Sequence, residues 1–278
     1  MEHKQDYFVG GKNHKIFYQS WSPSNPKAII QIIHGFAEHS GRYKYLIDKL
    51  TSANFIVYIN DHRGHGRSEG RRNHIRSLTE FAEDCYKLTM IIRGAQPNLA
   101  LFLIGHSMGS SIAQRYAIQH QAEIKGLILS GTGSKVQETP KIMVKLASIM
   151  SKIFPTFSGP TGIDPNNLSS DSKSVENYRN DPLINYKKST AAMGMSMFKH
   201  YSEVKDKISS IKIPVLFQSG EEDVMMLDAE EIFEDLTIED KTMKTYPNCK
   251  HEMYTESPQN KDLAINDLIS WIITHLQD

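Results

Sequence analysis

The stretch GHSMG, residues 105–109, is the most informative feature of this sequence. It follows the apolar run ALFLI (100–104) and precedes SSIAQRYAI (110–118), whose pattern is typical of a helix. A serine between two glycines, where a strand turns into a helix, sits in a tight, strained turn with its hydroxyl above the sheet. We therefore expect Ser107 to be a nucleophile and the N–H of Met108 to stabilise an oxyanion. GxSxG is short enough to arise by chance, and its strand–helix context is what favours catalysis.

Composition excludes several classes of protein. The 278 residues carry 32 acidic and 32 basic side chains, whereas a nucleic-acid-binding protein normally has a basic surplus. The two cysteines, Cys85 and Cys249, lie far apart in the sequence, which argues against a disulfide scaffold and favours a reducing compartment. The N-terminus MEHKQDYFVGG has no apolar signal region, and no apolar run is long enough to span a membrane. We expect a cytoplasmic protein that binds no nucleic acid.

Short apolar runs alternate with amphipathic segments along most of the chain. Residues 77–94 have helical spacing, with Ser77 and Glu80 placed as a capping box and Gly94 as a stop. Another helix is expected from Ser257 onward, with proline in its first turn. The expected buried strands are KAIIQIIHG (27–35), NFIVYIND (54–61), LALFLIGH (99–106), IKGLILSG (124–131) and IPVLFQSG (213–220). This alternation predicts an α/β fold with a mostly parallel central sheet covered by helices on both faces.

The alternation stops between Thr132 and Lys207, where helical patterns occur without clear strands. We expect a core formed by residues 1–131 and 208–278, with a helical cap insert at 132–207. The methionines of this insert either line a lipid channel or pack against the core: Met143, Met150, Met193, Met195 and Met197. A basic amphipathic helix within it either contacts a membrane or packs its apolar face, and it spans Ile142–Ile153 with Lys141, Lys145 and Lys152.

A nucleophilic serine needs a base that is oriented by a carboxylate. In sheets of this class the chain order is serine, acid, histidine, and all three lie at the carboxyl edge. Asp223 comes just after the last expected buried strand, beside the competing acids Glu221 and Glu222. Among the 12 histidines, His251 precedes the final helix and has the required order. These positions predict a triad of Ser107, Asp223 and His251.

The turn HG after the first apolar strand supplies a further expected element of the site. In this position a backbone N–H forms the second half of an oxyanion hole, here the N–H of Phe36. The alternative is an ordinary glycine turn. Because the serine, acid and histidine positions agree with it, we expect Phe36 and Met108 to form the oxyanion hole.

Six motifs of this sequence occur in the order found in one family. They are HGFAEHSGRY (34–43), DHRGHGRSEG (61–70), GHSMG (105–109), LSGTG (129–133), YRNDPLI (178–184) and HEMYTE (251–256). Over nearly the whole chain the sequence resembles the α/β-hydrolase superfamily, in particular the monoacylglycerol lipase and lysophospholipase group with its serine aminopeptidase S33-like domain. The resemblance implies the α/β-hydrolase fold, the same triad, and a lid over an apolar acyl channel. It also implies that Glu38, Arg42, His106 and Tyr178 surround the head group of the substrate, although Glu38 and Arg42 can instead pair structurally.

His62 and His65, within DHRGHGRSEG, raise the alternative of a metal site. No carboxylate or cysteine cluster completes such a site, so we expect Asp61, Arg63 and the glycines to form a hydrogen-bonded structural loop. We expect neither a metal nor a cofactor.

Taken together, these patterns predict a serine hydrolase that cleaves carboxylic esters of single-acyl lipids, either monoacylglycerol or lysophospholipid, with peripheral membrane contact through the cap as an open question. A broad short-chain carboxylesterase is the alternative enzyme. A non-catalytic lipid-binding protein on the same fold is the alternative of another class. The substrate is a small-molecule lipid ester in the first case, and the sequence leaves the oligomeric state open.

Overall fold

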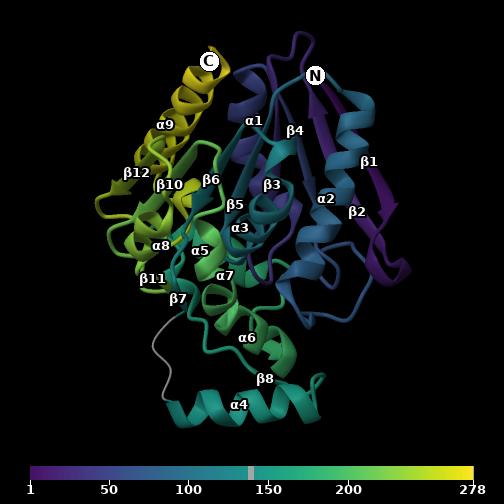
Figure 1. Ribbon diagram of the computed structural model, residues 1–278, viewed down its shortest axis with the longest axis vertical. Coiled ribbons are helices and arrows are strands. Elements are labelled where there is room, and N and C mark those ends of the chain that lie inside the picture. Colours follow the sequence, from purple (N-terminus) through teal and green to yellow (C-terminus); the bar gives the residue numbers. More distant parts are fainter. Residues whose placement is uncertain (137–140, 278) are drawn as a thin grey trace.

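The computed structural model describes residues 1–136 and 141–277, and in these a central sheet is flanked by helices (Figure 1). The sheet order is β1-β2-β4-β3-β5-β6-β10-β12, with parallel pairing from β4 to β12 and antiparallel pairing of β1 with β2 and of β2 with β4. The strand bounds are β1 (Glu2–Val9), β2 (Lys15–Ser22), β3 (Ala28–Ile33), β4 (Phe55–Asn60), β5 (Leu101–His106), β6 (Gly126–Ser130), β10 (Val215–Gly220) and β12 (Lys241–Tyr246). The mostly parallel sheet is therefore confirmed.

The five predicted buried strands all lie inside their predicted ranges, because each is an apolar run that is covered on both faces. The hairpin of β1 and β2 was not predicted. Nearly every residue of β1 is exposed at the sheet edge, so this strand carries no apolar run that would signal it. Its register is set by pairing with β2 instead, from Glu2 opposite Ser22 to Val9 opposite Lys15.

Helices cover both faces of the sheet and form one apolar core on each. α2 and α3 pack against Ile29 and Ile33, and α1 and α9 pack against Ile30 and Ile32 on the opposite face. α2 begins as predicted after Ser77, whose hydroxyl caps it, but it runs one residue beyond the predicted stop at Gly94. The bounds are α1 (Lys44–Ser52), α2 (Leu78–Ala95), α3 (Met108–His120), α8 (Ala229–Asp235) and α9 (Pro258–Gln277).

We call residues 132–207 the cap segment. It contains α4 (Lys141–Ile153), α5 (Ser172–Asn180), α6 (Ala191–Phe198) and most of α7 (His200–Ile208). It also holds three strands of two or three residues that the sequence pattern did not show: β7 (Lys135–Val136), β8 (Ser158–Pro160) and β9 (Lys188–Thr190). β8 pairs with β9, and β7 pairs with β11 (Met226–Leu227), which follows the Asp223 loop. Such short strands are too brief to show a two-residue period.

α4 lies at the end of the molecule opposite both chain termini (Figure 1). Among the described residues, no helix is long and apolar enough to cross a membrane.

Candidate active site

Ser107 stands at the turn between β5 and α3 with φ 54° and ψ −123°. A positive φ is strained for a residue with a Cβ, and such strain is found mainly where function requires it. The flanking glycines make this turn fit against its neighbours. A Cβ on Gly109 would lie 2.1 Å from the carbonyl oxygen of Ile33, and one on Gly105 would lie 2.4 Å from the carbonyl oxygen of Gly109. The sequence GHSMG thus brings the serine close to the end of β3.

Asp223 and His251 meet at the carboxyl edge of the sheet. Oδ2 of Asp223 lies 2.8 Å from Nδ1 of His251, and Oδ1 accepts the N–H groups of Met225 at 2.8 Å and Met226 at 3.2 Å. The competing acids Glu221 and Glu222 are exposed. Because an ionised carboxylate only accepts hydrogen bonds, Nδ1 of His251 carries the proton and Nε2 is left as a base.

Nε2 of His251 is buried and has no hydrogen-bond partner among the described residues. Ser107 and His251 line the same cavity, as expected of a nucleophile and its base. Burial by itself lowers the pKa of His251, but the charge and hydrogen bond of Asp223 raise this pKa above its ordinary value. Burial likewise opposes ionisation of Asp223, yet His251 and two backbone N–H groups hold its pKa below the ordinary value.

The two residues predicted for the oxyanion hole flank Ser107. Met108 is the first residue of α3, where N–H groups lack partners within the helix and the helix dipole favours negative charge. Phe36 follows β3 and lines the cavity together with Ser107. The turn that precedes it is close, since a Cβ on Gly35 would lie 3.2 Å from the Cβ of Ser107. This arrangement fits an oxyanion hole formed by Phe36 and Met108.

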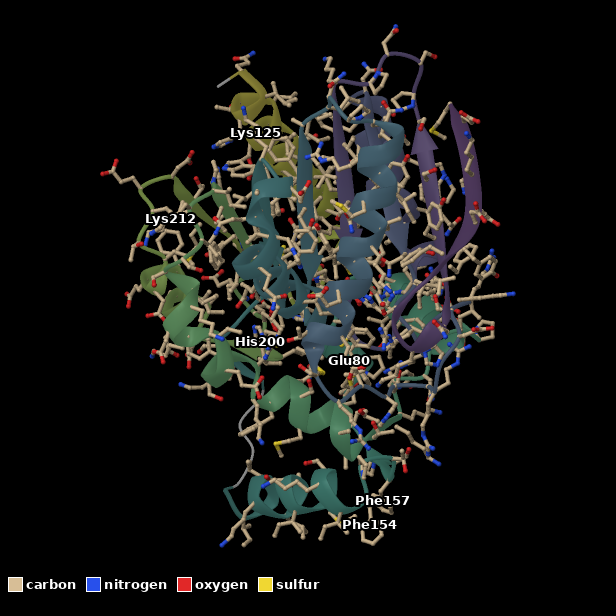
Figure 2. The ribbon with its side chains drawn as sticks, turned by 45° about the vertical axis from the view of Figure 1, so that its right-hand side comes forward. Glu80, Lys125, Phe154, Phe157, His200 and Lys212 are labelled. Atoms are coloured by element: carbon tan, nitrogen blue, oxygen red, sulfur yellow. The ribbon has the colours of Figure 1, made fainter. Side chains whose placement is uncertain are left out.

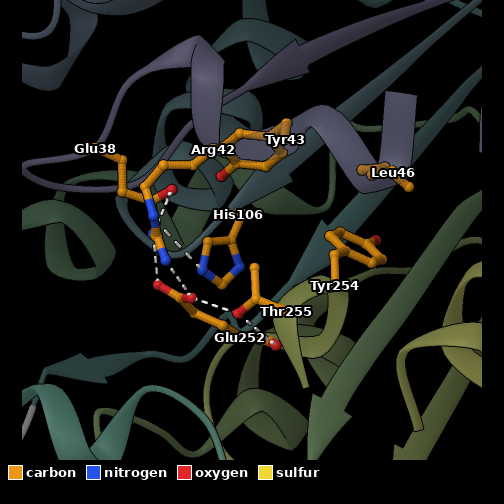
Figure 3. A pocket seen from close by; sticks show the side chains of 8 residues that line it. All are labelled: Glu38, Arg42, Tyr43, Leu46, His106, Glu252, Tyr254 and Thr255. Atoms are coloured by element: carbon orange, nitrogen blue, oxygen red, sulfur yellow. Dashed lines mark hydrogen bonds and ion pairs between the residues drawn. The ribbon is translucent and has the colours of Figure 1, made fainter. Parts of the chain in front are cut away.

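Arg42 is the centre of a buried polar cluster (Figure 3). Its guanidinium binds Glu252 through two bonds of 2.8 Å and Glu38 at 3.2 Å, and it lies 4.6 Å above the ring of Tyr178. Nε2 of His106 lies 3.8 Å from Glu38. The structure thus brings the four predicted head-group residues together. Arg42 is engaged with carboxylates, whereas Glu38 and Tyr178 also line the cavity of Ser107.

Glu252 was missed from the sequence, although it directly follows His251 in HEMYTE. Its carboxylate is the main partner of Arg42, which holds the pKa of Glu252 well below the ordinary value despite burial. Burial raises the pKa of Glu38 above its ordinary value, although the charge of Arg42 opposes this shift. Burial also lowers the pKa of His106 to about 3, which keeps its ring neutral.

Glu38, His106 and Glu252 lie close enough together to bind a metal ion. The guanidinium of Arg42 already places a positive charge against both carboxylates. A metal cation there would be repelled by Arg42 and would have to displace its hydrogen bonds. This cluster therefore does not fit a metal.

The cavity in front of Ser107 has a volume of about 650 Å³ and mostly apolar walls. α4 contributes Val144, Leu146, Ala147 and Met150 to these walls. The two alternatives for the cap methionines divide between residues: Met150, Met195 and Met197 line the cavity, Met193 packs in the core, and the side chain of Met143 lies outside the described residues. Met225 and Met226 add to the lining from the Asp223 loop.

His62 and His65 are buried beside His34 and Phe81. The backbone N–H of His62 donates to the ring Nε2 of His34 at 3.0 Å. The ring Nε2 of His62 lies 3.1 Å from the backbone carbonyl oxygen of His34. Burial lowers the pKa of all three histidines, which keeps them neutral. These contacts support the structural interpretation of the DHRGHGRSEG loop, in which Asp61 also accepts the N–H of Ser40 at 2.7 Å.

A mostly parallel sheet with helices on both faces and a serine at the turn between β5 and α3 is the architecture of the α/β-hydrolase fold. Residues 24–258 match the sequence model of the family described as serine aminopeptidase, S33, and the chain belongs to this family.

The chain is 31% identical to the monoacylglycerol lipase of Mycolicibacterium smegmatis, over 97% of this chain and 96% of that protein. It is 29% identical to the human monoglyceride lipase, over 96% of this chain and 89% of that protein. The crystal structure of the Paleococcus ferrophilus monoacylglycerol lipase superposes with a TM-score of 0.84 at 30% identity, covering 94% of this chain and 99% of that one.

Proposed function

We propose that this carboxylic ester hydrolase cleaves single-acyl lipid esters, with monoacylglycerol as its main substrate, through the triad of Ser107, Asp223 and His251. The observation that carries the proposal is the 650 Å³ apolar cavity onto which Ser107 and His251 open. A cavity of this size and polarity suits one acyl chain. The similarity to monoacylglycerol lipases over nearly the full chain supports the same substrate class.

In the proposed mechanism, Nε2 of His251 takes the proton of the Ser107 hydroxyl as its oxygen attacks the ester carbonyl. The N–H groups of Phe36 and Met108 stabilise the oxyanion of the tetrahedral intermediate. Asp223 keeps the proton on Nδ1 and stabilises the imidazolium. His251 then protonates the departing alcohol, and water repeats the sequence on the acyl-enzyme.

We further propose that the alcohol part of the substrate lies toward Glu38 and Tyr178, the two head-group residues that line both the cavity and the Arg42 cluster. A glycerol hydroxyl can accept from a protonated Glu38 or donate to an ionised one. The acyl chain would extend beneath the cap segment 132–207, which acts as the lid.

The first experiment measures hydrolysis of p-nitrophenyl esters with short, medium and long acyl chains, of a monoacylglycerol and of a lysophospholipid, using wild type and Ser107→Ala. We expect serine-dependent turnover that rises with chain length, since each buried methylene contributes about 0.8 kcal/mol. Ser107→Ala should lower kcat by on the order of 10⁴-fold or more.

The other outcomes separate the alternatives. Preferred cleavage of lysophospholipid would change the assigned head group, and turnover of short esters alone would favour a carboxylesterase. Folded wild-type protein that cleaves none of these esters would favour a lipid-binding protein. Near-normal turnover by Ser107→Ala would exclude the proposed mechanism.

We also propose that α4 contacts the membrane from which the substrate is taken. Its outer face exposes Ile142, Ile149 and Ile153, with Phe154 and Phe157 close by at the same end of the molecule (Figure 2). Lys145 and Lys152 are exposed on the same helix, and the side chain of Lys141 lies outside the described residues. An apolar face with lysines beside it is typical of helices that lie at an anionic lipid surface.

A further inference from the structure

The loop that carries His251 is bound on both sides of the histidine. The N–H of Lys250, just before it, donates to Oε1 of Glu256 at 2.8 Å. The N–H of Glu252, just after it, donates to the carbonyl oxygen of Leu168 in the cap segment at 2.8 Å. The backbone N–H groups of the residues before and after the catalytic base are therefore held by one buried carboxylate and by the cap segment.

Glu256 is fully buried. Besides Lys250, its carboxylate accepts the N–H of Ser170 at 3.1 Å to each oxygen, the N–H of Ser257 at 3.2 Å, and the hydroxyl of Ser170. A buried carboxylate is costly unless several donors satisfy it, and N–H and O–H bonds to a charged oxygen are strong. These donors come from both the histidine loop and the cap segment, so Glu256 joins the two.

Two further hydrogen bonds run between the same segments. The Ser169 hydroxyl donates to the carbonyl oxygen of Thr255 at 3.0 Å, and the ammonium of Lys250 donates to the carbonyl oxygen of Asn166 at 2.8 Å. Residues 166–170 of the cap segment are thus hydrogen-bonded to residues 250–257 at several points. This part of the cap is bonded to the active-site loop, whereas α4 lines the outer wall of the cavity.

We propose that Glu256 is a positioning residue for the hydrolysis, acting with Ser170 to fix His251 between Asp223 and Ser107. The inference rests on the proposed function. Glu256 fixes the backbone before His251, Leu168 fixes it after His251, and the Asp223 bond orients the ring. If Glu256 is removed, the N–H of Lys250 loses its acceptor. The segment before His251 then keeps the bond from the Glu222 N–H to the carbonyl oxygen of Cys249 and the bond from the Lys250 ammonium to Asn166. A displacement of about 1 Å in a catalytic group costs on the order of 10²-fold in rate.

The test compares wild type with Glu256→Ala, Glu256→Gln and Ser170→Ala, using a water-soluble p-nitrophenyl ester. We expect Glu256→Ala to lower kcat by on the order of 10–10²-fold while KM changes little, because the base and not the acyl cavity is disturbed. Loosening the bond to Asp223 should also move the acid limb of the kcat/KM profile to lower pH. Glu256→Gln keeps a carbonyl acceptor for the Lys250 N–H and should recover much of kcat, and Ser170→Ala should lower it by a smaller factor.

Glu80→Ala is the matched control. The carboxylate of Glu80 lies on α2 and accepts hydrogen bonds from Lys12 and Arg63, and it lines neither the cavity of Ser107 nor the pocket beside Arg42. Glu80→Ala should lower the melting temperature with kcat and the acid limb unchanged. The inference would be overturned if Glu256→Ala kept the wild-type kcat. It would also be overturned if Glu80→Ala lost as much kcat as Glu256→Ala when both variants showed the same drop in melting temperature. If Glu256→Ala does not fold, Glu256→Gln and Ser170→Ala provide the test. The inference would then be overturned if both variants kept the kcat and the acid limb of the wild type. An inactive wild type, or an active Ser107→Ala, would instead contradict the proposed function.

Discussion

At the scale of single residues, burial creates the chemistry of this site. His251 and Asp223 are both shielded from water, and burial alone would favour their neutral forms. Their mutual hydrogen bond reverses this preference, since a carboxylate at 2.8 Å stabilises the protonated imidazole. In the proposed mechanism, the same attraction would stabilise the imidazolium that forms when Ser107 loses its proton. The pair is thus suited to stabilise a charge that develops during the reaction.

The pH dependence of hydrolysis follows from this pair. His251 must be neutral to act as a base, and its pKa is raised, so activity should fall on acidification from a pH above the ordinary value of about 6.5. Asp223→Asn removes the charge that raises this pKa while burial still lowers it, so the acid limb should move to lower pH. The rate should fall by about 10⁴-fold, as expected for loss of the orienting carboxylate. Profiles of kcat/KM against pH for both proteins test this, and an acid limb that moves upward in the variant would contradict it.

Among the secondary-structure elements, the close approach of α3 to β3 determines the position of Ser107. α3 contacts the end of β3 at Gly109, where a Cβ would lie 2.1 Å from the carbonyl oxygen of Ile33. Such contacts need two elements that are distant in the chain. The sequence shows the glycine, and the structure shows which backbone it approaches.

Gly109→Ala should therefore disturb both folding and the elbow. The new methyl group would lie 2.1 Å from a backbone oxygen, so α3 or β3 must shift, at a cost of about 1–3 kcal/mol or more. Gly94→Ala in α2 is the control, because nothing lies within 4 Å of its Cβ position. There we expect stabilisation by about 0.5–1 kcal/mol from helix propensity. Urea unfolding of both variants measures these effects, and a Gly109→Ala protein as stable as wild type would refute the close-approach argument.

The elements themselves were predicted unevenly, for physical reasons. Strands β3 to β6 and β10 are buried on both faces, so an unbroken apolar run marks each of them. β1 is exposed and depends on pairing with β2, so it has no such mark. The short strands of the cap segment depend on tertiary pairing in the same way, β7 with β11 and β8 with β9.

In the whole molecule, α4 of the cap segment lies at the end away from the termini (Figure 1), and it exposes Ile142, Ile149 and Ile153 there. The outer face of α4 is exposed and its other side lines the cavity of Ser107. A lipid that leaves a membrane beneath α4 would thus have a short path to the nucleophile.

Binding to vesicles tests this arrangement. The double variant Ile142→Glu, Ile153→Glu replaces two exposed side chains that do not line the cavity. We expect at least about tenfold weaker co-sedimentation with phosphatidylcholine–phosphatidylglycerol vesicles, because apolar contact is replaced by two carboxylates facing an anionic surface. Turnover of a water-soluble ester should stay unchanged. Val9→Glu, at a similarly exposed position on β1, is the control, and equal binding by the double variant and this control would contradict membrane contact through α4.

The amino-acid sequence alone was enough to predict the five buried strands of the sheet and the candidates for the triad. These features can be recognised in the amino-acid sequence alone: apolar runs for the buried strands, a serine between glycines, and an acid and a histidine that follow it in order. The pairings among charged and polar groups could not be predicted from the sequence and were seen only in the tertiary structure. Arg42 pairs with Glu252, which is 210 residues away in the chain, and Glu256 joins Ser170 to the loop of His251. Such contacts leave no periodic signal, because they depend on how the chain brings distant segments together.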